Sequence, residues 1–362
     1  MATQATQVPD ARPLVEAIFA EALARRASDI HVEPEAEACD VRFRVDGLLV
    51  SHQKLDPAAG RAVVSRMMVM AHLLTYRLDV PQEGRITLEN VSAEARLSVM
   101  PTIHGLRAAV RMPAEHVQPA VLADLGLPRR VFEGLVTFAS IDGGMLILTG
   151  PAGSGKTTTI YALLRHIASN NGAISIVTLE DPVERDLAGV TQIEVSPFGQ
   201  LTYDKALRSI LRQDPQVLMI GEIRDAATAS LAVQAALSGH RLITTLHAAK
   251  PGGAVARLLE MGIEPYQLTS SIYGVVSQRL VRKKNSEKSG YCGRIPLAEM
   301  VIMDAALKKA VLERADADGL KRVYSRQAAY QSLADSGEEM AAAGLTDRDE
   351  LRRVLGVVEQ QS

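Results

Sequence analysis

The stretch Gly150-Pro151-Ala152-Gly153-Ser154-Gly155-Lys156-Thr157 decides the fold of this chain. It follows the apolar run Met145–Thr149 and precedes the helical pattern Thr158–Ile167, which is the context that the Walker A spacing requires. Its glycines let backbone N–H groups turn towards phosphate oxygens at the positive end of a helix. We therefore expect Gly150 to Thr158 to bind a nucleotide, with Lys156 neutralising the β- and γ-phosphates and Thr157 coordinating Mg²⁺. The alternative is a glycine-rich turn that binds nothing.

Three further apolar runs, separated by helical stretches, indicate a mainly parallel sheet covered on both faces. These runs are Ile174–Leu179, Val217–Ile220 and Leu242–Leu246. Acidic residues follow two of them: Glu180 and Asp181 after the first, and Glu222 after the second. In such a sheet the ligand lies at the carboxyl ends of the strands. One carboxylate can therefore deprotonate water while another holds the water shell of the metal.

Two histidines bracket the last of these runs. His247 ends it, and His240 lies in the turn before it. A histidine at this edge can contact the γ-phosphate and report its loss. A loop histidine that is merely hydrogen-bonded is the plainer interpretation, and composition alone favours it.

The first third of the chain has the pattern of a small α+β domain. A helical pattern opens at Pro13, and Asp46-Gly47 between alternating apolar residues predicts a β-hairpin. A second helix is expected over about Ala58 to Leu74. Short runs predict strands at Ser28–Glu33, Val41–Val45, Arg85–Leu88, Ala95–Met100 and Ala108–Met112.

These patterns divide the chain into five parts. We expect a disordered N-terminus over residues 1–12, a small α+β domain over 13–112, and a linker over 113–130 that is rich in proline. An α/β domain should follow over 131–300, and a helical C-terminal part over 301–362. Within the α/β domain, near its end, we expect a polar loop from Arg282 to Gly293.

Charge, cysteine content and the lengths of apolar runs indicate the partners and the compartment to expect. The net charge of −2 gives no drive towards DNA, so nucleic acid is not the expected partner. Cys39 and Cys292 lie far apart, which suits a reducing compartment better than a disulfide framework. No signal peptide and no apolar run of about 20 residues is present. We therefore expect a cytoplasmic protein that reaches a membrane only through partners.

At these residues the sequence resembles the secretion ATPase superfamily, the motors of type II secretion and of type IV pilus assembly and retraction. After the Walker A stretch, three more boxes match in order: Thr178 to Glu184, Arg212 to Asp225, and Ala235 to His247. The small domain also matches, at Ala27–Pro34, Arg42–Gly47, Pro81–Arg85 and Pro101–Gly105. The likeness covers roughly residues 13–300. In wording the boxes are closest to assembly-type members.

This resemblance implies a fold and a set of roles. The fold would be a RecA-like P-loop NTPase domain, preceded by a small α+β (PAS-like) domain and followed by a helical tail. ATP and Mg²⁺ would be the cofactors, with Glu180 as general base and Glu222 as the carboxylate on the Mg²⁺ side. His240 and His247 would be nucleotide sensors.

The resemblance also implies an assembly. Arg96 and Arg111 lie at the positions from which the family completes the site, and a guanidinium can stabilise charge on a transferred phosphoryl group. For each arginine the plain alternative is an exposed strand residue. The motor would be a homohexamer at the inner face of the cytoplasmic membrane. It would act on an inner-membrane platform protein and, through it, on pilin-like subunits.

Two departures from the family pattern affect these expectations. After His247 the chain has Ala248-Ala249-Lys250 where the family often has Thr-Asn-Asp. The loop from Lys283 to Ser289 contains no cysteine, whereas many type II secretion members carry a four-cysteine metal site there. We therefore expect no zinc. Three other interpretations stay open: a pilus retraction motor, a DNA-transfer ATPase of the same fold, and a nucleotide-dependent scaffold without turnover.

Overall fold

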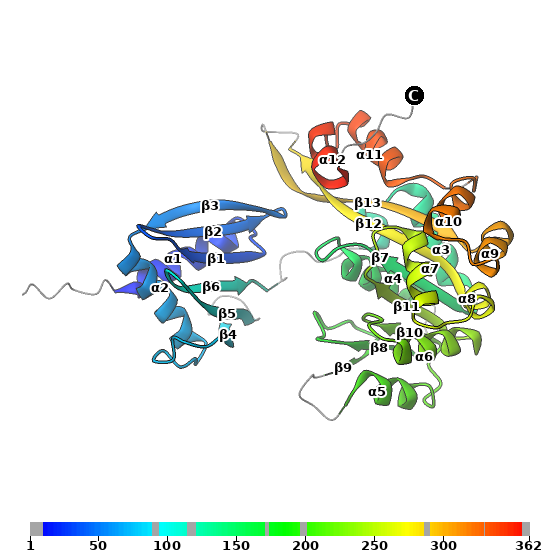
Figure 1. The fold of residues 1–362 in the computed structure, drawn as a ribbon, viewed down its shortest axis with the longest axis horizontal. Coiled ribbons are helices and arrows are strands. Elements are labelled where there is room, and N and C mark those ends of the chain that lie inside the picture. Colours follow the sequence, from blue (N-terminus) through cyan, green and yellow to red (C-terminus); the bar gives the residue numbers. More distant parts are fainter. Residues whose placement is uncertain are drawn as a thin grey trace, which may run out of the picture. The chain divides into compact units, whose positions relative to one another are not determined.

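The computed structural model describes residues 10–88, 94–113, 121–170, 174–195, 201–285, 290–328 and 330–356. The chain divides into two compact units, Met1–Gln118 and Pro119–Ser362 (Figure 1). Residues 1–9 of the predicted disordered N-terminus lie outside the described residues, as do 114–120 of the predicted linker and 286–289 of the predicted polar loop.

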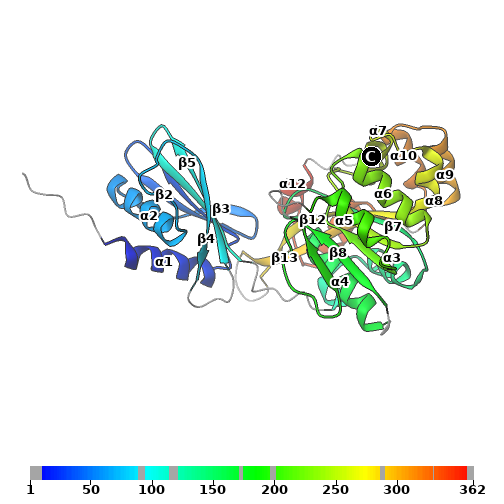
Figure 2. The same ribbon diagram turned by 90° about the horizontal axis from the view of Figure 1, so that it is seen from below.

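The first unit is an antiparallel sheet in the order β3-β2-β1-β6-β5-β4. Two helices pack their apolar sides on one face of this sheet and form its core (Figure 2). Its elements are α1 (Ala11–Ala24), β1 (Asp29–Pro34), β2 (Cys39–Val45), β3 (Leu48–Leu55), α2 (Pro57–Met70), β4 (Gln82–Thr87), β5 (Glu94–Thr102) and β6 (Gly105–Arg111).

Local sequence signals explain most of the boundaries in this unit. The predicted hairpin is confirmed: Val45 pairs with Leu48, and Asp46 and Gly47 both have positive φ, as a tight primed turn requires. The first helix begins two residues before the predicted Pro13. The Asp10 side chain accepts a hydrogen bond from the Arg12 N–H and caps the helix at Ala11.

The second unit has a sheet in the order β13-β12-β7-β11-β10-β8-β9, parallel except for β13. One face is covered by η1, α3 and α4, and the other by α5 to α10. Its elements are η1 (Leu122–Leu125), α3 (Arg129–Ser140), β7 (Gly144–Thr149), α4 (Lys156–Asn170), β8 (Ile176–Glu180), β9 (Thr191–Glu194), α5 (Tyr203–Ile210), β10 (Val217–Ile220), α6 (Ala226–Leu237), β11 (Arg241–Leu246), α7 (Pro251–Glu260), α8 (Pro265–Ser271), β12 (Ile272–Lys284), β13 (Tyr291–Ile302), α9 (Ala305–Leu312), α10 (Ala317–Tyr324), α11 (Leu333–Ala342) and α12 (Arg348–Leu355).

The main correction to the predicted elements is a long hairpin. β12 and β13 pair antiparallel across most of Ile272 to Ile302, where the sequence predicts a polar loop from Arg282 to Gly293. The prediction is wrong there because the outer end of this hairpin is not covered by the sheet core and carries charged residues. These polar residues instead hold the C-terminal helices.

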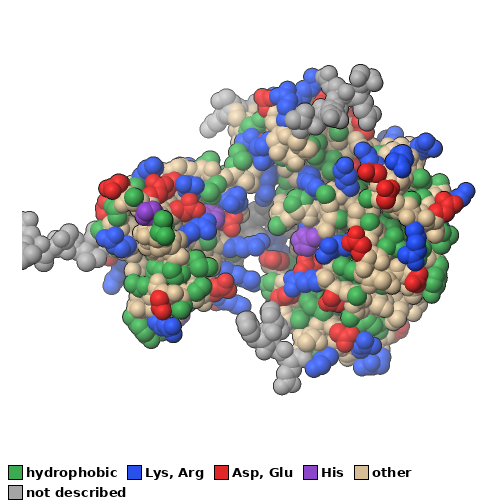
Figure 3. All heavy atoms as spheres, in the orientation of Figure 1, with side chains coloured by type: hydrophobic (Ala, Val, Ile, Leu, Met, Phe, Trp, Pro, Cys, Tyr) green, Lys and Arg blue, Asp and Glu red, His purple; other side chains and the backbone are tan. Residues whose placement is uncertain are grey.

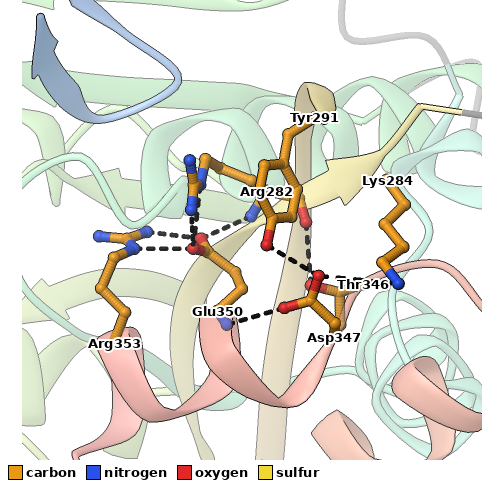
Figure 4. Close-up of polar contacts among 7 residues, drawn as sticks. All are labelled: Arg282, Lys284, Tyr291, Thr346, Asp347, Glu350 and Arg353. Atoms are coloured by element: carbon orange, nitrogen blue, oxygen red, sulfur yellow. Dashed lines mark hydrogen bonds and ion pairs between the residues drawn. The ribbon is translucent and has the colours of Figure 1, made fainter. Parts of the chain in front are cut away.

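A charged cluster fixes α12 to this hairpin (Figure 4). Glu350 is fully buried and accepts hydrogen bonds from Arg282 Nη2 at 2.7 Å and from Arg353 Nε at 2.7 Å. Burial alone would raise the pKa of Glu350, but the hydrogen bonds from both arginines lower it to about 2. The Tyr291 ring stacks on the Arg282 guanidinium at 3.9 Å, and its hydroxyl donates to Asp347 at 2.8 Å.

Candidate functional site

The glycine-rich stretch forms a tight loop between β7 and α4. Gly150, Gly153 and Gly155 all have positive φ, of +142°, +72° and +89°. A Cβ at Gly150 would collide with the Gln278 carbonyl oxygen, so only glycine fits there. The side chain of Ser154 is buried, and its Oγ has no hydrogen-bond partner among the described residues. A buried hydroxyl beside such a cradle of amides suits a phosphate oxygen.

Lys156 is the first residue of α4 and folds back over the loop. Its Nζ donates to the carbonyls of Gly150 at 2.8 Å and Pro151 at 3.0 Å. Burial, followed by the nearby charge of Arg279, lowers the pKa of Lys156. Thr157, the next residue, is exposed at the helix N-terminus. The loop therefore presents an ammonium group and a hydroxyl at the position where phosphate and Mg²⁺ are predicted to bind.

Gln278 supports the phosphate loop, although the local sequence pattern does not predict this role. Gln278 lies on β12 and is 1% exposed. Its amide donates to the Ser154 carbonyl at 2.8 Å and accepts from the Thr159 hydroxyl at 2.9 Å. A single side chain thus holds the loop and the first turn of α4 together. Gln278 reaches the loop because β12 pairs with β7, and this pairing cannot be read from the local sequence.

The strand register brings the other predicted residues to the same edge of the sheet. Thr149 of β7 pairs with Leu246 of β11, so Gly150 and His247 follow neighbouring strand ends. Ile220 of β10 pairs with Leu179 of β8, which places the acidic segments after these strands beside one another. Figure 1 shows β7, β11, β10 and β8 side by side. This edge is the place where a parallel sheet binds ligands.

A partly exposed ionic cluster occupies this edge. Glu222 pairs with Arg224 on one oxygen and with His247 Nε2 at 3.1 Å on the other. Arg224 also reaches Asp181 at 3.3 Å. Tyr203 of α5 lies near this ionic cluster. Burial, together with the charge of Asp181, raises the pKa of the Tyr203 hydroxyl to about 12. Arg224 and Tyr203 are not among the predicted site residues.

Glu180 differs from these residues because it is buried. It is 3% exposed and accepts hydrogen bonds from Tyr161, from Thr178 at 2.7 Å and from Gln192 at 3.0 Å. The oxygens of Glu180 are thus engaged by three donors, and its role as general base stays a prediction. Glu184, four residues later, is exposed. The sequence pattern does not distinguish the two, because the donors to Glu180 include residues of α4 and β9.

His240 lies at the end of β11 that is away from the phosphate loop. It immediately precedes β11, and its Nδ1 lies 2.9 Å from the Ala235 carbonyl. Gly150 and His247 lie at the other end of the paired strands β7 and β11. Six strand residues at about 3.3 Å each separate the two ends by about 20 Å. His240 therefore lies far from the phosphate loop of its own subunit, and its role as a nucleotide sensor stays a prediction.

Arg96 and Arg111 lie in the first unit, on the neighbouring strands β5 and β6. They are directly opposite one another in the register, and both are exposed. Their strand neighbours Ala95, Leu97 and Val110 are buried in the core of that unit. The two guanidinium groups therefore share the face of the sheet that the helices leave uncovered.

Three further observations on the described residues concern metal binding, membrane spanning and surface charge. Across the part of the chain that the structure describes, no group of three or more His, Cys, Asp or Glu side chains is arranged to hold a metal ion. Within the same ranges, no helix is long and apolar enough to cross a membrane. Figure 3 shows acidic and basic side chains interspersed over the visible face of the second unit, in keeping with a net charge of −2.

Comparisons with known proteins agree with this geometry. A family model described as "Type II/IV secretion system protein" matches residues 4–353. The type II secretion system protein HxcR of Pseudomonas aeruginosa is 38% identical, over 94% of this chain and 76% of that protein. The putative type II secretion system protein E of Escherichia coli K12 is 35% identical with the same coverage. The type IV pilus assembly ATPase PilB of Thermus thermophilus is 33% identical, but the match covers 42% of its length.

Solved structures show the same fold at lower identity. The Legionella pneumophila ATPase DotB has a TM-score of 0.72 at 20% identity, covering 98% of this chain and 97% of that one. The pilus retraction motor PilT with bound ADP has a TM-score of 0.67 at 24% identity, covering 96% and 97%. The predicted RecA-like ATPase fold with a mainly parallel sheet is confirmed.

Proposed function

This chain belongs to the type II/IV secretion system protein family and is an ATPase, and we propose that it is a hexameric motor for assembling a type IV pilus or a type II secretion pseudopilus. The observation that carries the proposal is the single sheet edge shared by the phosphate loop, Glu222 and His247. The names of the relatives favour secretion and pilus assembly over pilus retraction, DNA transfer or a scaffold without turnover.

In this proposal the phosphate loop binds the triphosphate. Its amides and Lys156 hold the β- and γ-phosphates, and Ser154 Oγ is available as a donor. Thr157 and Glu222 are the oxygen ligands that would hold Mg²⁺ and its water shell. When bound, Mg²⁺ neutralises charge on the transferred phosphoryl group.

Hydrolysis then needs an accessible proton acceptor. Water attacks the γ-phosphorus, the bond to the β-phosphate bridging oxygen breaks, and one water proton must leave. We assign its acceptance to Glu184, because it is exposed on the loop after β8 while Glu180 is buried. The backbone N–H of Glu184 is held by the Tyr161 hydroxyl at 3.3 Å, so the same tyrosine positions both acids. His247 orients the Glu222 carboxylate.

The proposal extends to assembly and location. Arg96 and Arg111 of one copy would complete the phosphate site of the next copy, since a guanidinium fork suits developing phosphoryl charge. Closure and release of six such sites would move a platform protein of the inner membrane, which in turn moves pilin-like subunits. The motor would work in the cytoplasm, peripheral to that membrane.

Mass measurement in solution tests the assembly. With Mg²⁺ and a non-hydrolysable ATP analogue, we expect six copies per particle, with smaller species when nucleotide is left out. A single copy at every concentration, with the analogue shown to bind, would refute the shared site. A hexamer that binds ATP but never turns it over would favour a scaffold instead.

A further inference from the structure

Arg279 is a cation beside the phosphate loop that the proposed reaction does not use. Ser277 of β12 pairs with Thr149, the last residue of β7. Beyond this pair β7 turns into the phosphate loop, while β12 continues straight through Gln278 and Arg279. The strand β12 therefore places the side chain of Arg279 beside the phosphate loop.

The guanidinium group of Arg279 makes two hydrogen bonds, one to its own strand and one to the loop after β11. Nη1 donates to the Gln278 carbonyl at 3.0 Å, and Nη2 donates to the Ala249 carbonyl at 3.1 Å. A Cβ at Gly150 would lie 3.2 Å from Nη1, so the group passes directly by Gly150. Since β7 lies between β12 and β11, this side chain spans from one neighbour of β7 to the loop after the other.

A buried acid on β13 faces the same region. Glu299 pairs with Ser277 in the hairpin register and is 5% exposed. It accepts hydrogen bonds from the Tyr330 hydroxyl at 2.8 Å and the Leu333 N–H at 3.3 Å. Burial raises the pKa of Glu299, and the charges of Lys250 and Arg279 oppose that rise. The charge of Arg279 thus acts on the acid and also on Lys156, whose pKa it lowers.

We propose that Arg279 is a positioning residue that ties the loop after β11, and therefore His247, to β12, the strand whose Gln278 holds the phosphate loop. The planar fork of an arginine fixes the directions of its N–H donors, whereas the ammonium of a lysine rotates on a flexible stem. The tied segment is Ala248-Ala249-Lys250, the stretch that departs from the common family wording. This inference rests on the proposed function, because His247 is there the residue that orients Glu222.

Steady-state kinetics and analogue binding of Arg279→Gln and Arg279→Lys test it. In both variants kcat should fall about tenfold, equivalent to about 1.4 kcal/mol, with the dissociation constant of a non-hydrolysable analogue changed less than about threefold. Lys283→Gln, which removes an exposed cation from the same strand, should behave as wild type. Full kcat in Arg279→Lys would overturn the proposal, because charge alone would then suffice.

A double-mutant cycle identifies the partner. If Arg279 acts through His247, the kcat of His247→Gln/Arg279→Gln should equal that of His247→Gln alone, whereas independent effects that multiply would overturn the proposal. Amide hydrogen exchange at Ala248 and Ala249 supplies a readout that needs no turnover. Exchange should be faster in Arg279→Gln, and unchanged exchange would count against the tie. If wild type hydrolyses no ATP, the proposed function fails while the exchange result still stands.

Discussion

At the residue scale, two carboxylates four positions apart have opposite surroundings. Glu180 is buried under three donors, while Glu184 is exposed on the following loop. A carboxylate whose oxygens are satisfied inside the protein stabilises the loops that donate to it. One that faces solvent is available to take a proton. Tyr161 hydrogen-bonds both the Glu180 side chain and the Glu184 backbone. The position of the exposed Glu184 therefore depends on the packing of the buried Glu180.

Glutamine at each position should separate the two roles. Glu180→Gln places an NH₂ group against a donor and should lower the free energy of unfolding by about 1–3 kcal/mol. Glu184→Gln should keep wild-type stability and analogue binding but lose turnover. Denaturant unfolding and ATPase rates measure both effects. Wild-type stability with lost turnover in Glu180→Gln would restore that residue as the general base.

At this scale, spacing predicted the site residues that follow strand ends. The Walker A stretch, Glu222 and His247 lie where the pattern put them, because the end of an apolar strand can be read locally. The burial of Glu180 and the place of His240 at the opposite end of its strand could not be predicted in the same way. Burial of a side chain depends on what distant segments bring to it. The direction from which a strand enters the sheet decides whether the residue flanking it reaches the ligand edge.

At the element scale, the hairpin of β12 and β13 has two functions. Its inner part supports the phosphate loop through Gln278. Its outer part holds α12 through the pairs of Glu350 with Arg282 and Arg353. A buried carboxylate left without these partners would be costly, and so would the arginines without the carboxylate. The ionic cluster therefore attaches α12 to the hairpin together with the apolar contacts of Val281 and Leu297 with Met340 and Leu351.

Glu350→Gln should reduce the free energy of unfolding by about 3 kcal/mol at neutral pH. The pKa of Glu350 is held at about 2, below its ordinary 4.5, so its contribution is complete above pH 4.5. That contribution is lost as the pH falls from 4.5 towards 2. Thermal unfolding of the variant and wild type across this range should show two curves that converge at low pH.

Glu338→Gln is the matched control. Its partner Arg348 also joins the C-terminal helices, at 3.0 Å, but both side chains are exposed. We expect a change below about 1 kcal/mol, with little dependence on pH in the same window. Equal effects of Glu338→Gln and Glu350→Gln would contradict the importance of burial in the cluster.

Sequence reasoning recovered most elements and missed this hairpin. Strands with continuous apolar runs, such as β7 and β10, were located almost to the residue. β12 ends in Arg282-Lys283-Lys284, and a local pattern of charges predicts a loop there. Those charges are tolerated in a strand because Glu350 and Asp347, far along the chain, supply their partners.

At the scale of the whole molecule, Arg96 and Arg111 belong to a different unit from the phosphate loop. If they act on the site of a neighbouring copy, inactive variants should complement one another. Arg96→Ala lacks the donated arginine and Lys156→Ala lacks the receiving loop, so mixed rings contain some intact sites. ATPase activity of the mixture should exceed that of either variant alone. No recovery, with mixing verified by mass, would contradict shared sites.

The family could be predicted from ordered motifs, because each box is a local signature. The pairing of copies is not encoded in any local pattern. Two exposed arginines on a sheet face look alike whether they face solvent or a partner. Only their register, with Arg96 opposite Arg111, marks them as a pair.

We propose that ATP is hydrolysed at the loop that contains Lys156. The most direct test compares steady-state ATP turnover, with Mg²⁺, of wild type and Lys156→Ala, with Lys283→Ala as a control on an exposed lysine. We expect turnover in wild type and in the control, and a loss of at least about a hundredfold in Lys156→Ala. Turnover in Lys156→Ala equal to that of wild type would contradict it.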